Sequence, residues 1–533
     1  MLTKRATSLA VLLLVVLCVV LTVRHPALFA VMTNGDQLTI PSLIDDFLHN
    51  PHFALSTWSL PRAPYFFPDG ALVLLLRLAT PDTVRLLALY AGLHALGLIA
   101  ATGLVIRRAL PEGGARSIAF VFALIGFALV LTLSYEPWYW PMLSLPFLPI
   151  SHAGPMICGL ALAAVFLGIR RGAVGWLVLT VASAALVLSD RFFIVYFIVP
   201  YLLVTVLTDG DPKRRESFKA IGAEAVAVLA GLTLLSTLHT QKTDPIHFDL
   251  GFQLANIAEV MQHSSWALWL LHLLALAAGA VIVVRWLGAA RKGAPAGPAG
   301  PAPIVVYVAL SGLAAGIATF LLWREAIDGQ LKYAIPVDFL LVFLGALAAE
   351  RLLRGQTLGP AVAVALALAT GTFAWTRTAD HDGLAEASAA NRALAAAFDG
   401  CSAQYGLKAG LADYWIARTI TMATDWRVQV NQVQPHVPVS PFFWGNNALW
   451  FYLDARTGAP NAYNFVVTPP TGRGGVEDLY GTPTRYVTCG DYELAVYDDS
   501  AALTAKVFGV IERYEPSAAE LTAPIRHGSA GAP

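Results

Sequence analysis

Three of the five carboxylates between residues 25 and 83 are candidates for a general base. Asp36 stands in the sequence Asn34-Gly35-Asp36-Gln37, and Asp45 and Asp46 follow as an adjacent pair. A carboxylate held beside a hydroxyl group takes up its proton while the oxygen attacks an electrophile. We take Asp36 as the candidate catalytic base and Asp45 and Asp46 as alternates. The competing interpretation for each is an ordinary solvated carboxylate, and the pair is a weak metal-site candidate because adjacent side chains diverge.

Other side chains are suited to hold a phosphate group. Arginine contacts phosphate oxygens through a planar fork, and lysine acts as a point charge. The phosphate-site candidates are Arg324, Lys332, Tyr333, Arg191 and His152, and the candidates for support of the site are Asp190, Arg62 and Asp69. The competing interpretations are basic side chains that only extend to the membrane surface, a lone structural histidine, and a surface ion pair in the Ser189-Asp190-Arg191 turn.

The composition places these residues in a membrane protein. The 533 residues are 57% hydrophobic and 13% charged, with a mean hydropathy of +0.62. Typical soluble chains have roughly 45 to 50% apolar and about 25% charged residues, so the composition argues against a soluble globular protein. The formal net charge of zero argues against a nucleic-acid partner. Four cysteines are too few for a disulfide-built scaffold.

Eleven apolar runs are long enough to cross a hydrocarbon core of about 30 Å. They cover residues 8–24, 84–106, 117–134, 153–169, 173–189, 192–208, 219–238, 265–287, 303–323, 334–350 and 358–376. We interpret the first as a retained anchor, because the residues that follow it make a poor cleavage region for a signal peptide. The stretch 70–83 is interrupted by Arg77 and Pro81, so we expect an interfacial or re-entrant helix there.

Basic residues predict how these spans are oriented. With the N-terminus inside, the short inner segments hold 16 Lys and Arg residues, the longer outer loops hold 8, and the C-terminal tail holds the other 11. Cytoplasmic loops carry such an excess of basic residues. All the candidate site residues then face the outside.

We therefore expect a polytopic α-helical membrane protein with about 11 transmembrane helices, an inner N-terminus and an outer C-terminus. Residues 1–376 would form the membrane domain, with its first outer loop at 25–83, and residues 377–533 an extracytoplasmic mixed α/β domain. A polar helix-forming stretch runs to about residue 400, and near-alternating apolar residues in 463–467 and 485–497 predict strands.

The cysteines are divided between the two parts of the chain. Cys401 and Cys489 lie in the predicted extracytoplasmic domain, where an oxidising compartment favours a disulfide. Two free buried thiols are the alternative. Cys18 and Cys158 lie in predicted spans, where we expect them to serve packing.

Four short motifs on the outer side have counterparts in a known enzyme family. They are Asn34-Gly35-Asp36-Gln37, Phe66-Phe67-Pro68-Asp69, Ser189-Asp190-Arg191-Phe192-Phe193 and Lys332-Tyr333-Ala334-Ile335-Pro336. In order and layout they resemble the catalytic Asp of the first outer loop, the aromatic-proline run, the later Asp-containing turn and the basic-Tyr-x-x-Pro start of a late span in the GT-C superfamily of integral membrane glycosyltransferases. The resemblance covers the membrane part of the chain. Gln37 stands where the common family variant has Glu, which leaves open whether Asp36 or Asp45 is the base.

The resemblance implies transfer of a sugar from a polyprenyl-phosphate donor to a cell-envelope glycan or lipid acceptor, on the outer side of a bacterial inner membrane. Asp36 would deprotonate the acceptor hydroxyl for in-line attack at the anomeric carbon. Arg324 and Lys332, helped by His152 and Arg191, would stabilise the departing phosphate. No cofactor is firmly implied, and a divalent metal, Mg or Mn, stays open. Besides donor and acceptor the expected partners are membrane lipids, with no nucleic acid, and the sequence leaves the oligomeric state undetermined.

The sequence assigns no residues to the acceptor site. Tyr414-Trp415 and Phe442-Phe443-Trp444 in the tail offer aromatic faces for sugar rings, although a hydrophobic core is the more common use of such residues.

Three other functions compete with this interpretation. A glycan polymerase or ligase uses similar lipid-linked donors but usually has its large outer loop in mid-chain. A secondary transporter places charges near the membrane midplane and often has repeated halves, whereas Glu224 is among the few acidic residues inside a span and we find no repeat. A sensor or scaffold would not need polar groups on four successive outer loops.

Overall fold

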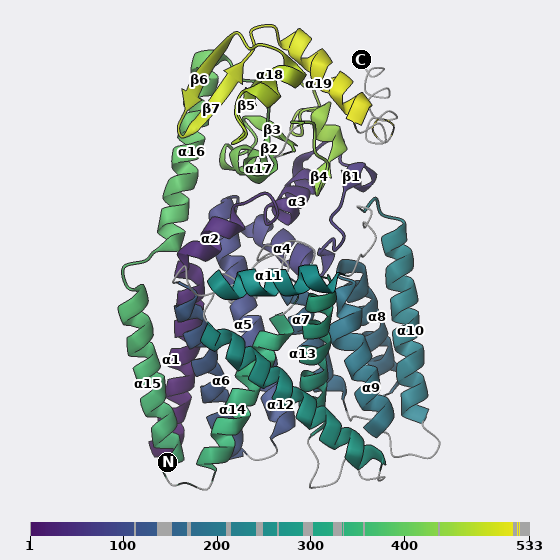
Figure 1. Ribbon diagram of the computed structural model, residues 1–533, viewed down its shortest axis with the longest axis vertical. Helices are drawn as coiled ribbons and strands as arrows, with labels where there is room; N and C mark the ends of the chain where they lie inside the picture. Colours follow the sequence, from purple (N-terminus) through teal and green to yellow (C-terminus); the bar gives the residue numbers. More distant parts are fainter. Residues whose placement is uncertain are drawn as a thin grey trace.

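Two parts of the chain lie one above the other along the long axis of the molecule (Figure 1): a layer of upright helices that contains the N-terminus, and an α/β domain at the opposite end. The computed structural model describes residues 2–110, 113–135, 152–167, 172–208, 215–240, 249–263, 266–291, 302–322, 333, 335–354, 356, 358–434, 438–514, 520 and 522. The protein is therefore helical and of the multi-span membrane type, with a C-terminal mixed sheet.

A helix lies over each of the eleven predicted apolar runs. These helices are α1 (Leu2–Arg24), α5 (Thr83–Ala109), α6 (Gly113–Leu133), α7 (Ala153–Phe166), α8 (Ala173–Ser189), η4 (Ile194–Ile198) continuing into α9 (Val199–Thr208), α10 (Arg215–Ser236), α12 (Trp266–Arg291), α13 (Pro303–Leu322), α14 (Ile335–Leu353) and α15 (Gly359–Thr378). Among the described residues, seven helical segments are long and apolar enough to cross a membrane, and three apolar helices are shorter. Exposed leucine and valine side chains, such as Leu229 and Val284, cover their outer faces, as expected of helices that contact lipid.

Small residues allow some of these helices to pack closely. Gly231 of α10 faces α8, and a Cβ atom there would lie 2.8 Å from Val187 Cβ and 2.9 Å from the Ala184 carbonyl oxygen. Helix pairs in membranes use such small residues to bring their backbones together. α1 packs in the same layer against α5, α6 and α15.

The segment between α1 and α5, here called the first loop, folds into short elements at the junction of the two parts. These are α2 (Pro26–Met32), α3 (Thr39–His49), η1 (Leu55–Thr57), β1 (Trp58–Ser59), η2 (Phe66–Gly70) and α4 (Ala71–Ala79). The nine residues of α4 are too few to cross a membrane, and its Leu75 and Leu78 are exposed. A separate short helix in the stretch 70–83 is therefore confirmed. α11 (Leu250–His263) also lies across the helical layer at this level (Figure 1).

The C-terminal domain is a mixed α/β fold, as predicted. Its elements are α16 (Gly383–Tyr405), β2 (Ala409–Asp413), α17 (Tyr414–Ala423), β3 (Gln429–Val433), β4 (Asn446–Asn447), η6 (Ala448–Phe451), β5 (Tyr463–Val467), α18 (Gly474–Tyr480), β6 (Arg485–Cys489), β7 (Tyr492–Val496) and α19 (Ser500–Tyr514). The five-stranded sheet has the order β3-β2-β5-β7-β6, with β2 parallel to β3 and β5, and β7 antiparallel to β5 and β6. The strands predicted at 463–467 and within 485–497 are confirmed.

Helices cover both faces of this sheet. Phe398 of α16 and Ile420 of α17 belong to one buried cluster with the strands, and Val476 of α18 and Val507 of α19 belong to another. The domain therefore has its own hydrophobic core of three layers.

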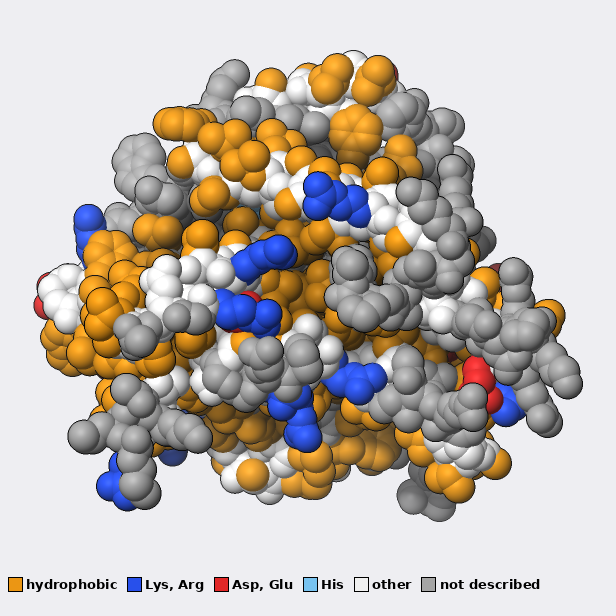
Figure 2. Space-filling model, turned by 90° about the horizontal axis from the view of Figure 1, so that it is seen from below, with side chains coloured by type: hydrophobic (Ala, Val, Ile, Leu, Met, Phe, Trp, Pro, Cys, Tyr) orange, Lys and Arg blue, Asp and Glu red, His pale blue; other side chains and the backbone are white. Residues whose placement is uncertain are grey.

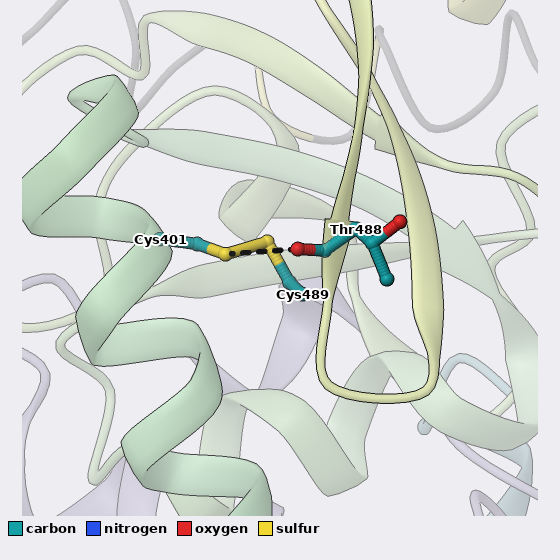
Figure 3. Close-up of a disulfide and its surroundings, with 3 residues drawn as sticks. All are labelled: Cys401, Thr488 and Cys489. Atoms are coloured by element: carbon teal, nitrogen blue, oxygen red, sulfur yellow. Dashed lines mark hydrogen bonds between the residues drawn. A yellow bond between two sulfur atoms is a disulfide. The ribbon is translucent and has the colours of Figure 1, made fainter.

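The predicted disulfide is confirmed. It joins Cys401 in α16 to Cys489 at the end of β6, with 6.0 Å between the Cα atoms (Figure 3). Cys18 and Cys158 are free, Cys18 buried and Cys158 partly so. Disulfides persist in oxidising compartments, so the bond is consistent with an extracytoplasmic C-terminal domain.

Candidate functional site

Asp36 lies between α2 and α3, where the first loop meets α17 of the C-terminal domain. The Tyr414 hydroxyl donates a hydrogen bond to Asp36 Oδ1. Gly35 packs directly on the Tyr414 carbonyl oxygen and leaves no room for a Cβ atom. Burial raises the pKa of Tyr414, and the Asp36 charge raises it further, so the phenol stays a donor. Asp36 itself is partly exposed.

Arg418, one turn after Tyr414, fixes this loop to the C-terminal domain. Its guanidinium donates to the Gly35 carbonyl oxygen at 2.5 Å and to Thr39 Oγ1 at 2.6 Å on the first loop. On the other side it donates to the Trp444 carbonyl oxygen at 3.3 Å and to that of Gly445. Burial lowers the pKa of Arg418, an effect that the nearby Tyr414 and Asp36 oppose. The loop that carries Asp36 is thus held by a buried cation of the other domain.

Asp45 is buried in an ion pair. Arg77 of α4 donates to both carboxylate oxygens, from Nε to Oδ1 and from Nη2 to Oδ2, each at 2.5 Å. The indole of Trp426 adds a third hydrogen bond to Oδ2 at 3.3 Å. This bidentate contact ties α3 to α4 and leaves Asp45 0% exposed.

Asp46 is a second structural carboxylate, and it is 1% exposed. Oδ1 accepts hydrogen bonds from Asn50 and Trp450, both at 2.7 Å. Oδ2 accepts from Trp58 at 2.7 Å and from Asn447 at 2.8 Å. Burial raises the pKa of Asp46, and the four N–H donors oppose that shift. As predicted, the adjacent Asp45 and Asp46 side chains diverge, and both serve to join elements.

His152 and Asp190 lie together on the helical layer. His152 caps the start of α7, and its Nδ1 contacts Asp190 Oδ2 at 2.7 Å. Because a carboxylate only accepts, Nδ1 carries the proton, and Nε2 accepts from the Tyr65 hydroxyl at 3.2 Å. Tyr196 also donates to Asp190 Oδ2 at 3.0 Å. The result is a buried chain from carboxylate through imidazole to phenol, with both ring nitrogens of His152 occupied.

Asp69 lies close to this chain, at the N-terminus of α7. Tyr90 donates to Asp69 Oδ1 at 2.5 Å, and His94 Nε2 lies 3.2 Å from the same oxygen. The carboxylate packs on Gly154, where a Cβ atom would overlap it. The positive end of the helix dipole favours a negative charge at this position.

Tyr65 connects these separate contacts into one site. Burial raises the pKa of the Tyr65 phenol well above its ordinary value, and the carboxylate charges of Asp190, Asp69 and Asp36 raise it further. The Tyr333 ring stacks on Phe192 at 4.4 Å and lies 4.9 Å from the His152 ring. We use the name junction site for six residues, of which Tyr65, His152, Asp190 and Tyr333 are joined by direct contacts, Asp69 packs on the adjacent start of α7, and Asp36 is near enough for its charge to act on Tyr65: Asp36, Tyr65, Asp69, His152, Asp190 and Tyr333.

The remaining predicted residues contribute less. Arg191 donates to the backbone oxygen of Arg62 at 3.1 Å, so both lie beside the turn that holds Asp190. Arg324 and Lys332 lie outside the described residues. Within the described part of the chain, no group of three or more His, Cys, Asp and Glu side chains is placed to hold a metal ion.

The sequence interpretation missed several residues of the site and its support. Tyr90 and His94 are polar side chains inside a predicted span. Because a polar side chain is costly to bury in a membrane without a partner, their presence indicated a buried partner. Tyr65 directly precedes the motif Phe66-Phe67-Pro68-Asp69. The sequence indicated Tyr414 only as an aromatic face for a sugar ring, and not as a hydrogen-bond donor to Asp36. Nothing in the sequence marked Arg418, because its partners, mostly backbone oxygens, lie far from it in the chain.

The junction site thus combines a partly exposed carboxylate on the first loop with a buried Asp-His-Tyr chain on the helical layer. The carboxylate can take up a proton, and the Tyr65 hydroxyl can donate a hydrogen bond to an anion once it turns away from His152. In the comparisons with known proteins, no protein-family model, no curated protein and no solved structure matches this chain.

Proposed function

We propose that the protein is a membrane glycosyltransferase of the GT-C type, which moves a sugar from a polyprenyl-phosphate donor to a cell-envelope acceptor. Asp36 is the observation that carries the proposal. Of the three candidate bases, Asp45 is held by Arg77 and Asp46 by four N–H donors, whereas Asp36 is partly exposed and lies at the junction of the two domains.

The proposal places the junction site on the outer face of a bacterial inner membrane, with eleven spans and the N-terminus inside. Figure 2 supports this orientation: the face at the N-terminal end carries Lys and Arg side chains with few acidic ones among its described residues. α5 ends there with Arg107 and Arg108, and α14 has Arg351 in its last turn. Basic residues favour the cytoplasmic side.

Asp36 acts in this proposal as the general base. Tyr414 binds Oδ1, which leaves Oδ2, among the described residues, for the hydroxyl group of the acceptor. The acceptor oxygen attacks the anomeric carbon as its proton passes to Asp36, and the bond from that carbon to the phosphate oxygen breaks. General-base assistance supplies about 10² to 10⁴ of the rate in such reactions.

The other end of the junction site receives the departing phosphate. The Tyr65 hydroxyl is oriented by His152, and His152 by Asp190. Because both nitrogens of His152 are occupied, the Tyr65 hydroxyl is the group that contacts the phosphate: its proton turns from His152 Nε2 to a phosphate oxygen when the donor binds. Arg324 and Lys332, which both precede Tyr333 in the sequence, supply the positive charge.

Purified protein in lipid nanodiscs, supplied with a panel of polyprenyl-phosphate sugars, tests the proposal. We expect wild type to consume one donor and Asp36→Asn to bind it, by thermal stabilisation, with turnover reduced at least a hundredfold. Asp82→Asn is the matched control, because this first-loop carboxylate caps α5 and Asn is an equally good cap. Donor turnover by Asp36→Asn at the wild-type rate would contradict the assignment of the base and return it to Asp45 or Asp46. The absence of any donor binding or turnover by either protein would contradict the transferase itself and favour a transporter or scaffold.

A further inference from the structure

Three aromatic rings of the C-terminal domain surround Tyr414, the residue that binds the proposed base. The ring centroids of Trp415, Phe442 and Trp444 lie 4.9, 5.4 and 5.4 Å from that of Tyr414. Their planes are inclined by 70°, 85° and 82° to the Tyr414 ring, so each makes an edge-to-face contact. We call Trp415, Phe442 and Trp444 the aromatic platform.

The platform is separate from the hydrophobic core. Trp415 is 47% exposed, and Phe442 and Trp444 are half-buried. Phe443, between these two, points the other way, because it is 7% exposed and packs on Phe451 with ring centroids 4.7 Å apart. Of the aromatic run 442–444, the core therefore takes Phe443, while its two neighbours stay partly accessible beside Tyr414, whose hydroxyl binds Asp36.

One buried guanidinium fixes the platform and the base loop to each other. Arg418 binds the Gly35 carbonyl next to Asp36, and it also binds the Trp444 carbonyl within the platform. The Tyr414 hydroxyl adds a direct bond from the centre of the platform to Asp36. A molecule lying on the platform is thereby held at a fixed position relative to the carboxylate.

We propose that the aromatic platform is the acceptor subsite and that it binds a sugar ring, so the acceptor is a glycan. The C–H face of a pyranose or furanose ring is apolar and packs on aromatic faces, while its hydroxyl groups point outward from the ring edge. One such hydroxyl then reaches Asp36, which needs a hydroxyl group as its partner. The inference rests on the proposed transferase function, whose acceptor class it specifies.

Binding of soluble oligosaccharides in the absence of any donor tests the platform. The full-length protein in detergent is titrated with a panel of gluco-, galacto-, manno- and arabino-oligosaccharides, and binding is followed by saturation-transfer NMR. We expect one member to bind wild type, Trp415→Ala to weaken that binding about tenfold, and Trp415→Phe to restore part of it. Trp375→Ala is the matched control, because Trp375 is 61% exposed on α15, in the helical layer. Equal melting temperatures show that the variants fold.

Three outcomes would overturn the inference: no oligosaccharide binds wild type, Trp415→Ala binds as tightly as wild type, or the variant loses affinity only for the polyprenyl-linked sugar. The last result would assign the platform to the donor. If the protein turns over a donor but no oligosaccharide binds the platform, the acceptor subsite is wrong and the transferase function is still supported. Platform binding without turnover of any donor keeps a glycan-binding site and removes the transferase.

Discussion

Replacing Asp46 by Asn should weaken the contact between the C-terminal domain and the first loop and lower the stability of the protein. Asp46 accepts four hydrogen bonds, two on each oxygen. Asn retains one acceptor oxygen and points its amide donor at the other pair of N–H groups, so two charged hydrogen bonds are lost. At about 1.5 to 3 kcal/mol each, the cost is about 3 to 6 kcal/mol.

Thermal unfolding followed by tryptophan fluorescence is the appropriate assay, because Trp58 and Trp450 bind Asp46 directly. For a domain of this size, 3 kcal/mol lowers Tm by about 6 °C or more. Asp82→Asn, an exposed cap exchanged for another good cap, should leave Tm within about 1 °C. If Asp46→Asn also melted within about 1 °C of wild type, the structural role assigned to this carboxylate would be wrong, and Asp46 would return as a candidate base.

Three further predictions concern the junction and the C-terminal domain. Reduction of the Cys401–Cys489 disulfide, which closes a loop with a sequence separation of 88, should destabilise the C-terminal domain by about 4 to 5 kcal/mol in chemical denaturation; an unchanged midpoint would contradict this. Burial, with the charge of a neighbouring histidine, lowers the pKa of His25 from 6.5 to about 4. The unfolded state then takes up a proton first, so stability should fall from pH 6.5 to 4 by up to about 3 kcal/mol, and His25→Phe should abolish this part of the pH dependence. Gly35→Ala should displace the base loop and reduce donor turnover at least tenfold, whereas Gly400→Ala, which has open space around it, should retain full activity.

The parts of the fold that depend on local sequence were predictable. A run of about 20 apolar residues has few alternatives to a spanning helix, and all eleven runs coincide with helices. Alternation predicted the strand at Tyr463–Val467. The disulfide between Cys401 and Cys489 was predictable because both residues lie in the part of the chain predicted to be in an oxidising compartment.

The contacts that build the site were not predictable, because they join residues far apart in the chain. Tyr414 and Asp36 are separated by 378 positions, and His152 and Asp190 by 38. The residue types and the predicted side of the membrane left three carboxylates as candidate bases, and the sequence could not distinguish among them. The separation came from partners on other elements, such as Arg77 for Asp45 and Trp450 for Asp46.

A structure of the protein with a non-hydrolysable polyprenyl-phosphonate sugar bound would test the central claim most directly. The account predicts the phosphonate next to Tyr65 and Tyr333, and the anomeric carbon on the side of Asp36, with space for an acceptor hydroxyl between that carbon and the carboxylate. Ligand bound away from the junction site, or a phosphonate seated against Asp36 itself, would contradict the assignment of the base and of the reaction.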